Sequence, residues 1–400
     1  MTDLSRTLSE LGDAGRREYW AALALRYAKG IGRESIASLL RRFGSAWDAV
    51  DHVLDWPKEF HRQGLQSNEW RKKAKKEWED TGKIGSSIVL WTDPLYPSSL
   101  KLITDSPAFL YGFGDIGLLS NPCVAVIGSR KCSATAAEFT TRTATALSKA
   151  GVTVVSGMAY GIDAFAHKGS LPYPGSTVAV LAGGVDRPYP RSSVPLYHLI
   201  RESGLVISEI PPGTAPINYL FPVRNRIISG MSSAVIVTEA AGSRSGSLLT
   251  AHIALEQGKN VFVPSPALNP CGASEGTKEL LLDGAKPLFH SDDILAHLYP
   301  DLKRRKNRSD APTPPMLPAE DVLPTKAAPP LAKERPSLSP EESQILNALE
   351  GKALSPDDLL RLLQQKDPKW TTSVVSSMLT MMEMRRLVRR NSRALYEVQA

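Results

Sequence analysis

The sequence predicts an α/β fold with a doubly wound, mainly parallel sheet and smaller domains on either side. Two observations predict the sheet. Between Cys123 and Phe289, short runs rich in Val and Ile alternate with segments of helical periodicity. The runs also lack the strict polar alternation of strands with one face in water. Strands covered on both faces and joined by helices form an open parallel sheet.

Six apolar runs are the candidate strands: residues 124–127, 152–156, 178–181, 205–208, 234–238 and 261–263. Helical patterns lie between them, at residues 136–149, 194–203 and 247–257. This regular strand–helix order predicts a Rossmann-like core over residues 86–300.

The first 85 residues predict a separate helical domain. Residues 18–29 and 34–43 have helical patterns and are joined by Gly30-Ile31-Gly32. This short glycine hinge is similar to the hairpin of helix-hairpin-helix modules, whose backbone amides approach a DNA phosphate. The motif is short, so a purely structural helical hairpin is an equal alternative.

Residues 301–339 predict an extended linker. The segment is rich in proline and poor in apolar residues, so it cannot bury enough surface to offset the entropy lost on ordering. It begins with a basic run, residues 303–308. That run either contacts phosphate or serves as a solvated tether, and the tether is the favoured interpretation.

Residues 340–400 predict a winged-helix domain. Three helical segments, 340–349, 355–364 and 371–384, precede a hairpin over residues 387–396. Ser355-Pro356 is a helix-start signal, because a capping serine precedes proline at the first helical position. The hairpin region is basic, with Arg385, Arg386, Arg389, Arg390 and Arg393. Winged helices bind either DNA or protein, and both alternatives stay open.

Composition narrows the functional classes. The 400 residues carry a formal net charge of +7, a modest excess that favours a polyanionic partner. No run of eighteen apolar residues predicts a membrane span, and the N-terminus lacks the apolar core of a secretory signal. Three cysteines without a C-x-x-C pair cannot form a disulfide framework. We therefore expect a cytoplasmic protein.

Glycine-rich loops follow several of the candidate strands. They are Gly128-Ser129-Arg130 and the loops at residues 157–163, 183–186 and 239–247. Glycine lets a backbone approach a bulky anion, and the helix N-termini that follow offer unpaired N–H groups. Because the carboxyl ends of parallel strands meet at one edge, these loops predict an anion pocket there.

Two motif matches do not fit their structural context. Residues 112–117 match G-x-G-x-x-G, but no crossover helix follows, so we interpret them as a turn. Residues 272–276 match G-x-S-x-G, but prolines separate them from the preceding strand, so we expect a loop leading to a helix at 277–283. A P-loop lysine motif is absent, and the seven histidines have no metal-ligand spacing. We predict no catalytic residues, metal or cofactor.

The segment from Phe221 to Gly230 is the most informative about a ligand. Phe221 precedes Arg224, Asn225 and Arg226, an aromatic close to cations. Single-stranded nucleic acid is held by cations on its backbone and aromatic faces under its bases. Phe221 is thus expected to stack on a base while the arginines neutralise phosphates. The alternative is a core Phe221 with one arginine paired to Glu209 or Glu239, and this alternative is strongest for Arg226.

Together these motifs resemble the DprA family (DNA-processing protein A, also called Smf) over about residues 90–290. The matching motifs are Gly128-Ser129-Arg130, residues 156–163 with His167, Gly183-Gly184-Val185-Asp186, Tyr189-Pro190, Ser208-Glu209, residues 225–230, Glu239 and residues 245–248. The flanks resemble the accessory domains of that family, a sterile-alpha-motif-like helical domain and a winged helix.

The resemblance implies a protein that binds and protects single-stranded DNA during natural transformation and loads a RecA-type recombinase. It also implies a homodimer formed through the Rossmann-like domain. The predicted DNA-binding residues are Gly128, Ser129, Arg130, Gly157, Phe221, Arg224, Asn225 and Arg226. Two positions depart from the family pattern. Asn218 stands where some relatives have lysine, and Lys278 replaces a more usual asparagine.

Two other hypotheses remain at this point. Rossmann-like phosphoribohydrolases also use glycine-rich strand ends, but their P-G-G-x-G-T-x-x-E signature is not matched by residues 239–246. Alternatively, the sheet serves mainly for dimerisation and the terminal domains bind DNA.

Overall fold

In the computed structural model the chain forms two compact units, Met1–Met316 and Leu317–Ala400. In the first unit the structure describes residues 6–58, 60, 63–67, 69–242, 245–265, 274–290 and 293–299. In the second it describes residues 340–349, 352, 354–365, 370, 375, 379, 388–390 and 395–398. The predicted linker, residues 301–339, lies outside the described residues. The predicted domain boundaries stay a prediction.

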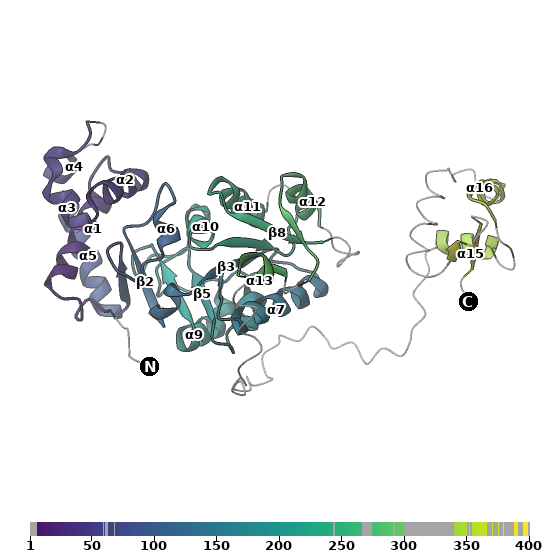
Figure 1. Ribbon diagram of the computed structural model, residues 1–400, viewed down its shortest axis with the longest axis horizontal. Helices are drawn as coiled ribbons and strands as arrows, with labels where there is room; N and C mark the ends of the chain where they lie inside the picture. The colour runs from purple at the N-terminus through teal and green to yellow at the C-terminus, as the bar shows by residue number, and fades with distance from the viewer. Residues whose placement is uncertain are drawn as a thin grey trace. The chain divides into compact units, whose positions relative to one another are not determined.

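In the described part of the first unit, nine strands form one sheet (Figure 1). They are β1 (Ser87–Leu90), β2 (Phe109–Gly114), β3 (Cys123–Ile127), β4 (Thr153–Ser156), β5 (Thr177–Val180), β6 (Leu205–Ser208), β7 (Ala234–Val237), β8 (Asn260–Pro264) and β9 (Lys286–Leu288). Their spatial order is β1-β2-β6-β5-β4-β3-β7-β8-β9. The pairs β1–β2 and β2–β6 are antiparallel, and the other neighbours are parallel.

The connectivity is doubly wound, as predicted. From β3 the chain proceeds outward through β4, β5 and β6, then returns to the other side of β3 for β7, β8 and β9. The six predicted strands are confirmed as β3 to β8. The predicted core helices are confirmed as α7 (Ala134–Lys149), α9 (Val194–Ser203) and α11 (Gly246–Glu256). The reversal of strand order beside β3 creates a topological switch point, where open α/β sheets bind ligands.

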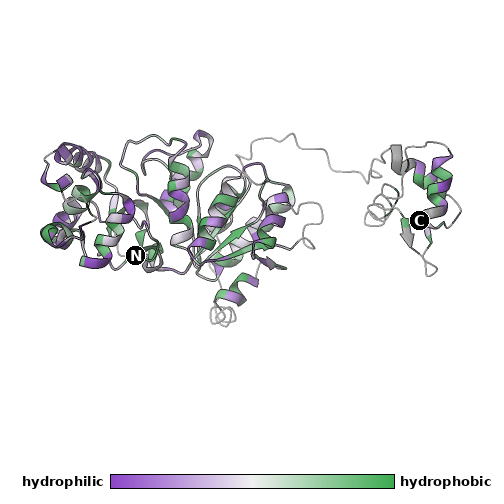
Figure 2. Ribbon diagram, turned by 90° about the horizontal axis from the view of Figure 1, so that it is seen from above, coloured by the Kyte–Doolittle hydropathy of each residue, from purple (hydrophilic) through white to green (hydrophobic). Residues whose placement is uncertain are grey.

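Helices cover both faces of the sheet, which explains the continuous apolar strands. Val124 and Val126 of β3 pack in the cluster that contains residues of α7, α8 (Ile162–Ser170) and α13 (Asp293–Leu298). The alternate residues Ala125 and Ile127 belong to the cluster with α10 (Leu220–Gly230), α11 and α12 (Glu275–Leu282). Figure 2 shows mainly hydrophobic strands, in green, among helices that carry both hydrophilic and hydrophobic residues.

The N-terminal segment forms five helices in its described residues. They are α1 (Asp13–Tyr27), α2 (Arg33–Phe43), α3 (Ala46–Asp51), α4 (Gln63–Gln66) and α5 (Glu69–Ile84), with a 3₁₀ turn at Val53–Asp55. The two predicted helices are confirmed as α1 and α2. The Glu18 carboxylate accepts the backbone N–H groups of Ala46 at 2.7 Å and Trp47 at 2.8 Å. These bonds satisfy free donors at the start of α3 and hold it against α1.

A buried polar network joins these helices to the sheet. The Tyr19 hydroxyl of α1 lies 3.0 Å from Thr81 Oγ1 of α5 and 2.8 Å from the Tyr111 hydroxyl of β2. Tyr111 in turn donates to the Glu77 carboxylate, which also pairs with Arg26. Burial of the network raises the pKa of both tyrosines, so each hydroxyl keeps its proton and can donate.

Strands β1, β2 and β9 were not predicted. The interpretation of residues 112–117 as a turn is wrong at Gly112–Gly114, which end β2 and pair with β6. A 3₁₀ turn, Ile116–Ser120, follows β2 in place of a crossover helix. The context that the dinucleotide fingerprint requires is therefore missing, as the sequence indicated. A short helix, α6 (Ser98–Lys101), connects β1 to β2.

The second unit contains α15 (Pro340–Leu349), α16 (Pro356–Gln364) and a hairpin of β10 (Val388–Arg390) and β11 (Tyr396–Val398). The Ser355 hydroxyl accepts the Asp358 N–H at 3.2 Å, which confirms the predicted cap. Most of the predicted third helix, and Arg385, Arg386 and Arg393, lie outside the described residues. Within the described part of the chain, no helix combines the length and apolarity needed to cross a membrane.

His167 on α8 makes the stability of the first unit depend on pH. Its ring is fully buried, with Nδ1 2.7 Å from Thr177 Oγ1. Among the described residues, Nε2 has no hydrogen-bond partner. Burial lowers the pKa of His167 to about 3, because the charged imidazolium would lie in the core without a hydrogen-bond acceptor for its second N–H group.

The unfolded chain therefore binds a proton near its ordinary pKa of 6.5, and the folded chain does so only near 3. Stability is lost as the pH falls through this window. Between pH 7 and pH 5 we expect His167 to remove about 2 kcal/mol from the free energy of unfolding. Urea unfolding of wild type and His167→Asn at both pH values measures this difference. Equal losses in the two proteins would contradict the assignment.

Candidate nucleic-acid interface

A cavity of about 470 Å³ lies at the carboxyl ends of β3, β4 and β7, beside the switch point. Its lining comes from the end of β3, the loops after these strands, the start of α8, one side of α10 and the first two turns of α11. The residues are Ile127, Gly128, Ser129, Arg130, Lys131, Ala159, Asp163, Phe221, Arg224, Asn225, Ile228, Ala241, Ser245, Gly246, Ser247 and Thr250. We call this space the switch-point cavity.

The loop after β3 is held by Glu239 at the end of β7. Ser129 N–H donates to the Glu239 carbonyl at 2.7 Å. Ser133, the cap of α7, donates its N–H at 3.0 Å and its hydroxyl at 2.7 Å to the Glu239 carboxylate. A Cβ on Gly128 would lie 2.8 Å from the Glu239 carbonyl oxygen, so the loop after β3 needs glycine here to approach Glu239 this closely. The backbone under Arg130 is thus positioned before any ligand arrives.

Arg224 joins the ends of β4 and β5 beneath the cavity. Its Nη1 donates to the carbonyls of Gly157 at 2.6 Å and Val180 at 2.7 Å, and its Nε donates to Asn225 Oδ1 at 3.1 Å. Burial lowers the pKa of Arg224 to about 10, while the nearby Asp163 carboxylate acts in the opposite direction. Arg224 remains charged at neutral pH and contributes a fixed positive charge to the cavity.

The loop after β4 folds around the Asp163 carboxylate. Asp163 Oδ2 accepts the N–H groups of Gly157 and Ala159, each at 3.2 Å. Between them Met158 adopts a left-handed φ of 59° and is fully buried. A Cβ on Gly157 would lie 2.3 Å from Arg224 Nη1, so the guanidinium occupies the space that a side chain would need. This glycine allows Arg224 to reach the strand ends.

Phe221 provides an aromatic surface at the cavity, partly buried against Ala182, Ile210 and Leu220. The guanidinium carbons of Arg130 and Arg224 each lie 5.9 Å from its ring centroid. Arg130 is exposed, whereas Arg224 is buried. One aromatic ring close to both an exposed cation and a buried one can hold a base and its phosphate together.

The first turn of α11 adds hydrogen-bond donors to the same space. Ser245 caps the helix and accepts the Leu248 N–H at 3.3 Å, and Gly246 and Ser247 line the cavity. The start of a helix carries partial positive charge, which favours an anion. Ser243 and Arg244, from the loop just before this turn, lie outside the described residues.

The structure places six of the eight predicted binding residues along the cavity: Gly128, Ser129, Arg130, Phe221, Arg224 and Asn225. Gly157 lies below them, in contact with Arg224. Arg226 points elsewhere. Its Nε lies 2.9 Å from Asp105 Oδ2, and its Nη2 pairs with the Glu209 carboxylate. This is the alternative pairing that the sequence raised for Arg226.

Sequence reasoning missed Lys131, an exposed cation that also lines the cavity. The available signal was its position directly after Arg130 in a strand-end loop. Of the two departures from the family pattern, Asn218 and Lys278 are both exposed and neither lines the cavity.

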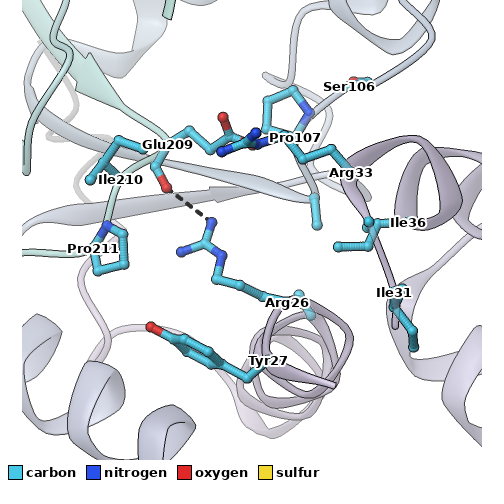
Figure 3. A pocket seen from close by; sticks show the side chains of 13 residues that line it. Arg26, Tyr27, Ile31, Arg33, Ile36, Ser106, Pro107, Glu209, Ile210 and Pro211 are labelled. Atoms are coloured by element: carbon cyan, nitrogen blue, oxygen red, sulfur yellow. Dashed lines mark hydrogen bonds and ion pairs between the residues drawn. The ribbon is translucent and has the colours of Figure 1, made fainter. Parts of the chain in front are cut away.

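A second cavity, of about 410 Å³, lies between the α1–α2 hairpin and the end of β6 (Figure 3). Ile31 of the hairpin is 8% exposed and faces this space with Ile210 and Pro211. Arg26 Nη2 donates to the Glu209 carbonyl at 3.0 Å, and Arg33 Nε lies 3.9 Å from the Glu209 carboxylate. The hairpin thus packs toward the core, which favours its structural interpretation over a DNA contact.

One group of possible metal ligands comes together in the described residues, although their sequence spacing gave no signal. His252 of α11 lies 3.3 Å from Asp283 at the end of α12, and Glu279 lies within 4.8 Å of both. All three are at least partly exposed. Gly272 and Ala273 of the G-x-S-x-G match lie outside the described residues, and Ser274 stands at the N-cap position of α12.

Comparisons with known proteins agree with this architecture. Residues 87–299 match the family model described as DNA recombination-mediator protein A, and residues 327–392 match the DprA winged helix domain. The DNA processing protein DprA of Streptococcus pneumoniae is 42% identical over 205 residues, which are 51% of this chain and 71% of that protein. Protein Smf of Synechocystis is 33% identical over 290 residues, covering 70% and 72%. The X-ray structure of the S. pneumoniae DprA superposes with a TM-score of 0.58 at 33% identity, over 70% of this chain and 97% of that one.

Proposed function

Because the chain belongs to the DprA family of DNA recombination-mediator proteins, we propose that it binds single-stranded DNA in the switch-point cavity. In this proposal Phe221 stacks on a base, while Arg130, Lys131 and the start of α11 hold phosphates. Arg224 and Asn225 shape the floor, and Gly128, Ser129 and Gly157 provide the close backbone packing. Arg226 acts in the fold rather than on the DNA.

The observation that carries the proposal is that the guanidinium carbons of Arg130 and Arg224 each lie 5.9 Å from the Phe221 ring centroid. A phosphate site alone would not need an aromatic ring, and an apolar pocket would not need two guanidinium groups. A base attached to a phosphate satisfies both. Single strands offer unpaired bases for stacking, whereas a duplex keeps its bases stacked on each other.

The wider role follows from the family. We propose that the bound strand is protected and then passed to a RecA-type recombinase during natural transformation, in the cytoplasm, by a homodimer formed through the Rossmann-like domain. The C-terminal winged helix then contacts DNA or protein. The names of the S. pneumoniae and Bacillus subtilis relatives, DNA processing protein DprA, support the general role in DNA processing.

The enzyme alternative, hydrolysis of a nucleotide, is less well supported by the geometry. Asp163, the one carboxylate among the described residues that line the cavity, is buried and accepts two backbone N–H groups. The Glu239 carboxylate nearby accepts both donors of Ser133. Carboxylates held in this way maintain loops and are poorly placed to activate water. The sites therefore fit binding better than catalysis.

Fluorescence anisotropy with a labelled single strand, competed by unlabelled duplex over a range of salt, tests the proposal. We expect the single strand to bind more tightly than the duplex. If Arg130 and Lys131 each neutralise one phosphate, log Kd should change with log salt by a slope of about 1.4 or more. Equal affinity for both forms would contradict base stacking. Absence of binding with release of a free base from a nucleoside monophosphate would favour the enzyme.

A further inference from the structure

Two exposed tyrosines lie beside the switch-point cavity without a role in the core. Tyr160, in the loop after β4, is 48% exposed, and Tyr189, in the loop between β5 and α9, is 45% exposed. Single exposed aromatics are common on protein surfaces. These two are notable for their place, since both loops lie at the carboxyl edge that forms the cavity.

Tyr189 continues the aromatic surface that begins at Phe221. The two ring centroids are 5.6 Å apart with an interplanar angle of 66°, an edge-to-face pair. Phe221 lines the cavity, while Tyr189 does not. Tyr189 therefore extends the stacking surface from the cavity rim outward.

Tyr160 is linked to the same loop as Tyr189. Ser192, three residues after Tyr189, donates its hydroxyl to the Tyr160 hydroxyl at 2.9 Å. Ala159, the neighbour of Tyr160, lines the cavity. The aromatic rings of Phe221, Tyr189 and Tyr160 thus come from the start of α10 and from two loops linked to each other beside the cavity.

The loop that carries Tyr160 is rigid, so its exposure follows from its backbone. Asp163 accepts the N–H groups of Gly157 and Ala159, and Met158 fills the core at 0% exposure. Gly161 follows with φ of 70°. This conformation turns Met158 inward and Tyr160 outward, which leaves a large apolar ring in water at a preorganised position.

We propose that Tyr160 and Tyr189, the tyrosine shelf, form a second base-stacking surface for a single strand that leaves the switch-point cavity past Phe221. This inference rests on the proposed function and adds a path for the strand. The cavity holds one base with its phosphates, and the shelf supports the bases that follow along the ends of β4 and β5. The protein then prefers a polynucleotide to a short oligonucleotide.

The test compares two oligothymidylates in the full chain, one of about 4 and one of about 20 nucleotides, lengths that span the usual size of single-strand sites. We expect Tyr189→Ala and Tyr160→Ala each to weaken binding of the long oligonucleotide by about fivefold or more, the effect of losing one stacked base. Binding of the short oligonucleotide should be nearly unchanged. Tyr189→Phe and Tyr160→Phe, which keep the rings, should bind both like wild type.

Tyr173→Ala is the matched control. Tyr173 is a partly exposed tyrosine with Lys149 Nζ 4.8 Å from its ring centroid, but it precedes β5 at the opposite edge of the sheet. Suppose that both shelf variants bind the long oligonucleotide like wild type, while Phe221→Ala weakens binding of both oligonucleotides. The proposed role of the tyrosine shelf is then contradicted, and DNA binding in the switch-point cavity is supported. If the shelf variants weaken binding of the short and the long oligonucleotide equally, the idea of a stacking surface separate from the cavity is also contradicted. If wild type binds neither length, the proposed function fails together with the shelf.

Discussion

Replacing Arg226 with alanine is expected to lower the free energy of unfolding of the first unit by about 3–5 kcal/mol. Its side chain is 7% exposed and pairs with Glu209, whose side chain is 11% exposed, and with Asp105. Removing the arginine leaves a buried carboxylate without its main partner. Arg33, 3.9 Å from Glu209, is too distant and too exposed to replace it without rearrangement. Urea unfolding followed by tryptophan fluorescence measures the loss.

Arg142→Ala provides the matched control for Arg226→Ala. Arg142 is 65% exposed and makes a single surface pair with Glu138 at 3.8 Å. Such pairs contribute about 0–1 kcal/mol, so this variant should unfold nearly like wild type. An Arg226→Ala protein with wild-type stability and weakened DNA binding would return Arg226 to the DNA-binding set and contradict its structural assignment.

Phe221→Ala is expected to weaken binding of single-stranded DNA by at least about fivefold, because a stacked base contributes about 1–3 kcal/mol. Arg130→Ala should weaken binding as well and reduce the salt dependence by about 0.7, since one phosphate contact is lost. The two losses have different physical origins. Anisotropy at two salt concentrations therefore separates them, because the Phe221 loss should persist at high salt.

Neither change should unfold the protein. Arg130 is exposed, and Phe221 packs only partly against its small apolar cluster. Arg142→Ala again serves as the control, now for the loss of an exposed positive charge outside the cavity. If Phe221→Ala and Arg130→Ala both bind like wild type, DNA is held elsewhere, and the terminal domains become the candidates.

The central strands could be predicted because burial on both faces leaves a continuous apolar run. All five residues of β3 are buried, and its Val and Ile side chains suit a pleated surface. Two of the strands that were not predicted carry a weaker form of this signal. β9 contains Pro287 and only one buried residue, while β2 ends in Gly112-Phe113-Gly114 and pairs antiparallel with β6. Their pairing depends on distant segments, which local sequence does not contain.

The cavity could be predicted in part, because the strand-end rule brings distant loops to one edge. The roles of the two arginines on α10 could be assigned only once their positions on the helix were known. Residues two apart differ by about 200° around a helix, so Arg224 and Arg226 must face opposite sides. One side meets the cavity and the other meets Glu209. Lys131 was missed because a lone lysine after a motif has no distinguishing pattern.

The Tyr19–Tyr111 hydrogen bond determines which parts of the protein fold and unfold together. It joins α1 to a strand inside the sheet, and Arg26 reaches from the same helix to the Glu209 carbonyl at the end of β6. Without α1 and α5, the Tyr111 hydroxyl and the buried face of β2 would lose their cover. Helices and sheet should therefore open and close as one cooperative unit. The N-terminal helices thus cover part of the sheet and contribute to the stability of the same folding unit.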